Sequence, residues 1–205
     1  GWDDIRLPFI AALRRRGLQP GAFANYAIAI GPSKVDKTVS IEEFMHIIYD
    51  YNKKILDPIT ERYFFVQHPE KISIEGAPKH DAKLPLHPDR DMGFRTLKTE
   101  KDFYIQKQDV EEIKKAKEGQ LFRFMHLFNF KKEKGKLKFH SLYHQPELKA
   151  KLFHWLPADE KQLSKTVVKM PNGEEIKGWA EKSVEKLKQG QVIQFERFGF
   201  VCKQE

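Results

Sequence analysis

The chain has 205 residues, enough for one large domain or two small ones, with 40% hydrophobic and 32% charged residues, a balance typical of globular rather than disordered proteins. No apolar run approaches the length of a membrane span or of a signal-peptide core, and the lone Cys202 excludes an internal disulfide and a multi-cysteine zinc site. The net charge is +8, and the lone cysteine leads us to expect a cytoplasmic rather than a secreted protein.

The first sixty residues predict three helices. Apolar residues recur at helical spacing from Leu7, Pro8 suits a first helical turn, and a run of arginines followed by Gly17 marks the end of the helix. A second helix is predicted over residues 21–30. A third is predicted to begin after Ser40, because Ser40 and Glu43 have the spacing of a capping box.

After residue 58 the pattern changes to short segments rich in aromatic and β-branched residues, which is typical of an all-β sandwich or barrel. The predicted strands cover residues 63–67, 71–75, 94–96, 102–106, 121–130, 136–143, 151–156, 166–170, 176–178 and 192–201. Two short helices are predicted over residues 110–117 and 180–188. Residues 131–135 and 171–173 are predicted to be hairpin turns.

The net positive charge comes entirely from the second part of the chain. Residues 1–70 contain nine basic and nine acidic residues, whereas residues 71–205 contain 28 basic and 20 acidic residues. This asymmetry is compatible with a polyanion partner for the second part, and equally with a lysine-rich solvated surface.

Catalytic and metal-binding patterns are not found in the sequence. Eight histidines occur, but none forms a His-x-x-x-His pair or stands beside a cysteine, and the glycines are dispersed rather than gathered in a phosphate-binding loop. We therefore predict no catalytic residue, no metal site and no cofactor site in this chain.

Four stretches carry a family resemblance. They are GWDDIRLPFIAALRRRG at 1–17, NKKILDPITERYFFV at 52–66, LPLHPDRDMGFR at 84–95 and QFERFGF at 194–200. In order and spacing they resemble the C-terminal region of glutaminyl-tRNA synthetases and of archaeal-type glutamyl-tRNA synthetases. The form LDPITERYFFV and the compact segment between residues 131 and 188 look more like the glutamyl enzymes.

The resemblance implies an α+β fold in three parts. Residues 1–60 would form a helical subdomain that contacts the tRNA stem, residues 61–130 with 190–205 a proximal anticodon-binding β-barrel, and residues 131–189 a distal one. The chain would return to the first barrel at its C-terminus. It also implies a C-terminal fragment, inactive alone, of a monomeric enzyme whose own catalytic domain uses ATP and magnesium to attach glutamate to tRNA(Glu).

Four residues match anticodon-contacting positions of the family, and these are Arg62, Arg123, Gln194 and Arg197. An ion pair at a domain junction is the alternative for Arg62, and a salt bridge is the alternative for Arg123. In a regular strand Gln194 and Arg197 point to opposite faces, so both can contact one base only if the backbone is distorted. We predict such a distortion near Phe198 and Gly199.

Five further cations are candidates for contacts with the tRNA backbone, namely Arg14, Arg15, Arg16, Lys131 and Lys132. The three arginines also suit a helix C-terminus on electrostatic grounds, and the two lysines also suit a solvated hairpin. Two alternatives remain for the whole chain: the same region of a glutaminyl enzyme, and a basic β-barrel adaptor that docks onto other proteins.

Overall fold

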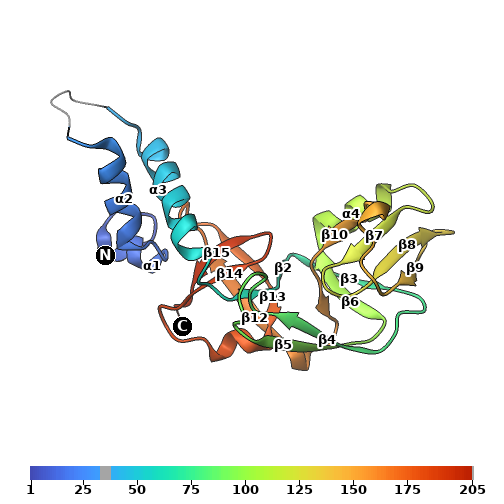
Figure 1. Cartoon of the computed structure of the whole chain (residues 1–205). Coiled ribbons are helices and arrows are strands. Elements are labelled where there is room, and N and C mark those ends of the chain that lie inside the picture. The colour runs from blue at the N-terminus through green and yellow to red at the C-terminus, as the bar shows by residue number, and fades with distance from the viewer. Residues whose placement is uncertain (33–37, 205) are drawn as a thin grey trace.

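The computed structural model describes residues 1–32 and 38–204. Three helices at the N-terminus stand apart from two groups of strands, which follow one another along the long axis of the molecule (Figure 1). The middle group contains the strands nearest the C-terminus, and the outer group lies farthest from the helices.

The helical part contains α1 (Ile10–Arg15), α2 (Pro20–Ile30) and α3 (Ile41–Leu56). Ser40 caps α3, because its hydroxyl accepts a hydrogen bond from the Glu43 backbone nitrogen at 3.1 Å, which confirms the start predicted for this helix. Helix α1 begins at Ile10, later than predicted. Helices α2 and α3 pack side by side around a small apolar core that includes Ala22 and Ile48.

The middle group is built from three sheets. They are β1 (Arg62–Tyr63) with β14 (Val192–Phe195) and β15 (Gly199–Cys202), β2 (Phe65–Gln67) with β12 (Leu163–Lys169) and β13 (Glu175–Glu181), and β4 (His80–Pro85) with β5 (Phe94–Thr99). Strand β1 runs parallel to β14, so the first and last parts of the β region are joined in one sheet.

The outer group is built from two sheets and one helix. They are β3 (Pro69–Ser73) with β6 (Asp102–Gln106) and β11 (Leu156–Pro157), β7 (Leu121–Phe124) with β8 (Asn129–Glu133), β9 (Lys136–Ser141) and β10 (Lys151–Phe153), and α4 (Lys107–Lys115). Short 3-10 turns occupy Pro146–Leu148, Glu160–Gln162 and Lys182–Lys186.

Two apolar cores hold the β region together, and the segment of β1 and β2 runs between them. Phe64 and Val66 belong to a large core rich in aromatic rings, whereas Tyr63 and Phe65 belong to a second core with Ile193 and its neighbours. Alternate side chains of an extended segment point in opposite directions, so this one segment contributes to both cores. We call them the aromatic core and the C-terminal core.

Two predicted strands are hairpins instead. Residues 121–130 turn back between β7 and β8, and residues 192–201 turn back between β14 and β15. Each turn has a left-handed residue that is not glycine, His126 at φ 57° and Arg197 at φ 63°, so the sequence lacks the usual turn signal.

Other expectations differ from the structure as well. Strand β4 was not predicted, and the helix predicted over residues 180–188 is the end of β13 followed by a 3-10 turn. The mixed helix and strand content agrees with the α+β prediction, but the sheets within residues 1–32 and 38–204 are open and no closed barrel is formed among them. Strand β13 pairs with β2, and β10 pairs with β7, across the predicted boundary at residue 131; the predicted domain limits stay a prediction.

Candidate nucleic-acid interface

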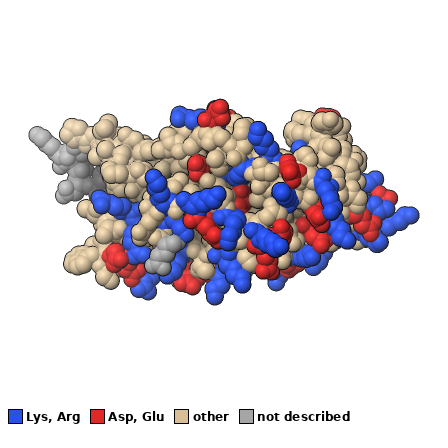
Figure 2. Space-filling model, turned by 90° about the horizontal axis from the view of Figure 1, so that it is seen from below, with Lys and Arg blue, Asp and Glu red and all other residues tan. Residues whose placement is uncertain are grey.

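The basic residues of the β region are interleaved with acidic ones. Figure 2 shows blue and red side chains mixed across the face seen from below. Lysines of the outer group pair with carboxylates, for example Lys71 with Asp102 at 3.0 Å and Lys136 with Glu75 at 2.6 Å. Net charge alone therefore does not locate a site, and the partners of each candidate residue have to be considered one by one.

Arg62 and Gln194 are brought together by the parallel pairing of β1 with β14, in which they lie directly opposite each other. One guanidinium nitrogen of Arg62 binds the Asp57 carboxylate at 3.1 Å. Arg62 Nε and Gln194 Oε1 are both buried and have no hydrogen-bond partner among the described residues. A buried donor and a buried acceptor are thus left unpaired on adjacent strands, an arrangement that a polar ligand would satisfy.

Three further charged residues, Glu196, Lys53 and Lys54, influence the surroundings of Arg62. Burial raises the pKa of the Glu196 carboxyl, against the opposing influence of Arg95 and Arg62. At the end of α3 the exposed Lys53 and Lys54 line a surface hollow of about 410 Å³ beside Asp57. These two lysines were not singled out in the sequence analysis. Their place in the last turn of a helix, just before a predicted contact residue, is a usable signal.

Arg197 lies in the turn between β14 and β15 and is tied to α4. Its two terminal nitrogens donate to the two carboxylate oxygens of Asp109 at 2.9 and 3.0 Å. The Asp109 side chain is 3% exposed and the Arg197 side chain 34% exposed. This bidentate ion pair fastens the last hairpin of the chain to the helix of the outer group. The backbone break predicted near Phe198 is present, but as a complete turn that directs Arg197 to Asp109.

His154 extends this network into the aromatic core. Its Nε2 lies 2.7 Å from the Phe65 carbonyl oxygen, so Nε2 carries the proton and donates. Its Nδ1 is then free to accept a hydrogen bond from Arg197 at 3.3 Å. Burial lowers the pKa of His154 to about 4, so the imidazole is neutral near pH 7. His154 and its neighbour Trp155 are both fully buried.

Arg123 on β7 is 8% exposed and has no carboxylate partner among the described residues. One of its terminal nitrogens donates to the Asn129 side-chain oxygen at 3.0 Å and to the Leu142 carbonyl oxygen at 3.4 Å. Burial lowers the pKa of the Arg123 guanidinium. The salt bridge considered as an alternative for Arg123 is therefore not formed with any residue that the structure describes.

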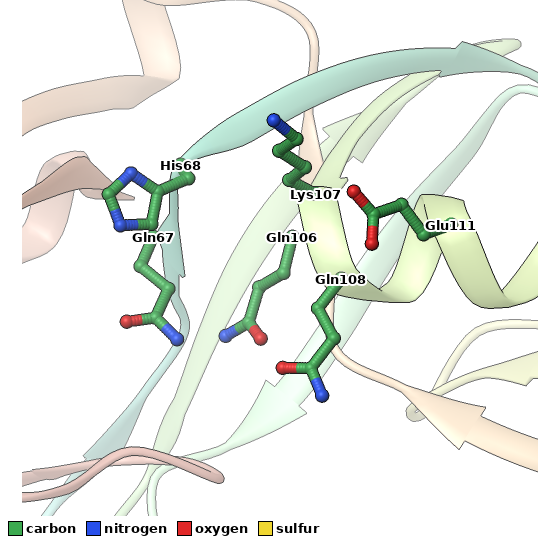
Figure 3. Close-up of a pocket in the computed structure, with 6 residues that line it drawn as sticks. All are labelled: Gln67, His68, Gln106, Lys107, Gln108 and Glu111. Carbon is green, nitrogen blue, oxygen red and sulfur yellow. The ribbon is translucent and has the colours of Figure 1, made fainter.

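A polar pocket of about 210 Å³ lies at the N-terminal end of α4 (Figure 3). It is lined by Gln67, His68, Gln106, Lys107, Gln108 and Glu111. Figure 3 shows the three glutamine carboxamides on the same side of the view, whereas Lys107 points the other way. Carboxamides both donate and accept hydrogen bonds, so the lining can match polar edges of a ligand. The sequence does not reveal this pocket, because Gln67 at the end of β2 lies far along the chain from Gln106 and Gln108 at the junction of β6 and α4.

The arginines at the end of α1 occupy three different environments. Arg14 is exposed and contacts no side chain of the described residues through an ion pair. Arg15 binds Asp3 at 2.8 Å and Gln204 at 2.8 Å, which links the helical part to the end of the chain. Arg16 is held by the Tyr49 hydroxyl, and burial lowers its pKa. Arg14 is therefore the cation of the three that is available to a phosphate.

The two predicted hairpin lysines also have partners within the protein. Lys131 binds Glu133 at 3.1 Å. The Lys132 ammonium donates to the backbone carbonyls of Lys114 and Ala116 at 2.7 and 2.9 Å, at the C-terminal end of α4. A cation at that end of a helix is favoured by the helix dipole, so the contacts of Lys132 have a structural explanation.

Within residues 1–32 and 38–204 no group of three or more histidine, cysteine or acidic side chains is placed to hold a metal ion. In the same part of the chain, none of the helices combines the length and the apolar character needed to cross a lipid bilayer.

The comparison with protein families identifies the β region. Residues 60–144 match the family model described as tRNA synthetases class I (E and Q), anti-codon binding domain, and residues 142–204 match a second model with the same description. The chain belongs to this anticodon-binding family. The two matched segments meet in the outer group, just after β9.

Individual relatives extend the similarity of this anticodon-binding chain to its helices. The glutamate–tRNA ligase of Pyrococcus abyssi is 41% identical over 98% of this chain, and that of Methanocaldococcus jannaschii is 40% identical over 98%. The glutamate–tRNA ligase of Methanopyrus kandleri is 37% identical over 100% of it. The aligned part is 35%, 35% and 37% of these relatives, so the chain spans about a third of their length.

Proposed function

We propose that this chain is the anticodon-binding part of a glutamate–tRNA ligase and holds the anticodon end of tRNA(Glu). The full-length protein would attach glutamate to that tRNA with ATP and magnesium in a catalytic domain of its own, as a cytoplasmic monomer. The relatives that carry the name glutamate–tRNA ligase support this choice over a glutaminyl enzyme. The contribution of this chain is positioning: by holding one end of the tRNA, it directs the other toward the catalytic domain.

The observation that carries the proposal is the unpaired polar pair of Arg62 Nε and Gln194 Oε1. Leaving a buried donor and a buried acceptor without partners costs about 1–3 kcal/mol for each group. The pairing edge of an unstacked base offers both an acceptor and a donor, which is the complement of this pair. A base that reaches this pair would supply the missing partners of both groups.

The two-barrel arrangement is part of the proposal. The C-terminal core and the aromatic core are separate, and the segment of β1 and β2 contributes side chains to both. Arg62 lies at the start of this segment and Arg197 ties the C-terminal hairpin to α4. In the proposed complex the anticodon bases lie across this junction, with lysines around it contacting phosphates.

The test compares the affinity of the chain for a tRNA(Glu) transcript with its affinity for the same transcript carrying a substituted anticodon, over a range of salt concentrations. We expect log K to fall linearly with log salt because phosphate contacts release counterions. Gln194→Ala is expected to weaken binding of the cognate transcript by about 1–3 kcal/mol and to reduce discrimination between the two anticodons.

Lys79→Ala is the matched control, because Lys79 is an exposed cation paired with Glu100 at 2.8 Å and far from Gln194 in sequence. It should leave discrimination unchanged. Equal affinity of the unmodified chain for both transcripts would contradict the proposal. Salt-insensitive binding to another protein, without binding to RNA, would favour the docking adaptor, and a preference for a tRNA(Gln) transcript would favour the glutaminyl alternative.

A further inference from the structure

Tyr143 is unusually exposed for an aromatic residue in an ordered chain. It is 81% exposed, and it lies two residues after the end of β9 in the outer group. The other phenyl rings nearby, such as Phe124 and Phe130, are fully buried in the aromatic core. A ring that packs against nothing in the folded chain is available to contact a partner.

A hydrogen bond from the Asn129 side chain holds the backbone at Tyr143. The Asn129 side chain is 1% exposed, and its amide nitrogen donates to the Tyr143 carbonyl oxygen and to the Ser141 hydroxyl, each at 2.8 Å. Its side-chain oxygen accepts from Arg123 at 3.0 Å. One buried amide thus connects the backbone of an exposed ring to a buried guanidinium.

Arg123 supplies the second observation. A nearly buried guanidinium usually has a carboxylate partner, but both hydrogen-bond partners of Arg123 are neutral oxygens, from Asn129 and Leu142. Its charge is left without a counter-ion among the described residues, within two hydrogen bonds of the exposed Tyr143 backbone. An anionic or acceptor-rich ligand at this position would compensate that charge.

We propose that Arg123, Asn129 and Tyr143 form a nucleotide-binding site in which an unstacked base lies on the Tyr143 ring and its acceptor groups meet Arg123. Asn129 is a positioning residue that holds both. This inference rests on the proposed function and deepens it by adding a stacking platform that the sequence did not reveal. The uncompensated cation favours RNA over an apolar protein partner for the same ring.

The test uses tRNA(Glu) transcripts that carry the fluorescent base 2-aminopurine at one anticodon position at a time. Stacking on Tyr143 quenches this base, so we expect the unmodified chain to quench at one position. Tyr143→Ala should abolish the quenching and weaken binding about 5- to 100-fold, the range measured for base–aromatic stacking. Tyr143→Phe should retain both, because the ring remains.

Asn129→Asp tests the positioning role. The new carboxylate still accepts from Arg123 but cannot donate to the Tyr143 carbonyl, and it gives Arg123 a counter-ion. We expect weaker binding and weaker quenching in a protein that still folds, as followed by circular dichroism. Phe94→Ala is the matched control, since the Phe94 ring is also exposed, at 55%, and lies on β5 in the middle group.

The outcomes separate this inference from the function on which it rests. If Tyr143→Ala keeps the affinity, the quenching and the anticodon discrimination of the unmodified chain, the Tyr143 site is wrong and the proposed function stands. If the unmodified chain itself fails to distinguish anticodons, the proposed function fails first. If Tyr143→Ala loses binding to a protein partner and none to RNA, the ring is a protein-docking residue.

Discussion

The surroundings of Arg197 and of Arg123 differ in one respect that decides what each arginine can do. Both residues were expected to contact bases. Arg197 is bound by both oxygens of the buried Asp109, whereas Arg123 meets only the neutral oxygens of Asn129 and Leu142. The bidentate pair with a buried carboxylate fastens Arg197 to another element, whereas Arg123 keeps a charge that an anionic ligand would compensate. Residue type and position along the strand do not distinguish these two cases.

Removal of the Arg197 side chain is expected to have the largest effect on stability. Arg197→Ala leaves the Asp109 carboxylate buried without a partner, so we expect the free energy of unfolding to fall by about 3 kcal/mol. This is the lower end of the range for breaking a buried ion pair, because part of the Arg197 side chain is exposed. Urea denaturation measures the loss. We expect the double variant Arg197→Ala with Asp109→Ala to lose less unfolding free energy than the sum of the losses in the two single variants. If the losses are additive, the two residues do not stabilise the fold as a pair.

The pH dependence of stability gives the second contrast. In the unfolded chain His154 titrates near 6.5, whereas in the folded chain burial lowers its pKa to about 4. Its contribution is therefore complete above pH 6.5 and is lost as the pH falls toward 4, because the unfolded state binds the proton first. Between pH 7 and pH 5 we expect a loss of about 2 kcal/mol.

The matched variant for this measurement is His154→Gln, which keeps a donor for the Phe65 carbonyl and an acceptor for Arg197 but does not titrate. Its unfolding free energy, measured by denaturant titration at each pH, should decrease less steeply between pH 7 and pH 5 than that of the unmodified chain. Parallel pH profiles would show that the imidazole is already accessible to protons in the folded state.

The smallest effect on stability is expected at Arg123. Arg123→Met retains volume and removes a cation that has no carboxylate partner, so the free energy of unfolding should change by only about 1 kcal/mol. The same substitution should weaken RNA binding by about 1–3 kcal/mol. Thermal unfolding and transcript binding, measured on one preparation, test both statements. A large loss of stability with unchanged RNA affinity would reverse the contrast between the two arginines.

Capping and glycine signals in the sequence predicted a helix start and one hairpin correctly, but turns without glycine at the left-handed position were not predicted. Ser40 and the glycine after residue 172 mark a helix start and a hairpin that the structure contains. The hairpins around His126 and Arg197 were not predicted because their left-handed residues are not glycine or asparagine, and because apolar residues continue through most of the first of these turns. Strand alternation alone cannot reveal where such a run reverses direction.

The candidate site was only partly accessible from the sequence. The resemblance supplied Arg62 and Gln194, but their adjacency depends on a parallel strand pair between distant parts of the chain. The partner of Arg197 could not be predicted, because Asp109 lies on a helix that only the tertiary fold brings to the β14–β15 turn. Tyr143 has no sequence signal, because only the fold shows which aromatic rings are buried and that this one is exposed.

The parallel pairing of β1 with β14 also sets an order of events during synthesis. Arg62 is made well before the strand that carries Gln194, so the two cannot meet until β14 has left the ribosome. The sheet of β7 to β10 requires no residue of β14. A nascent chain can therefore complete the outer sheet while its base-contacting pair is still absent, and RNA that arrives early finds no finished Arg62–Gln194 site.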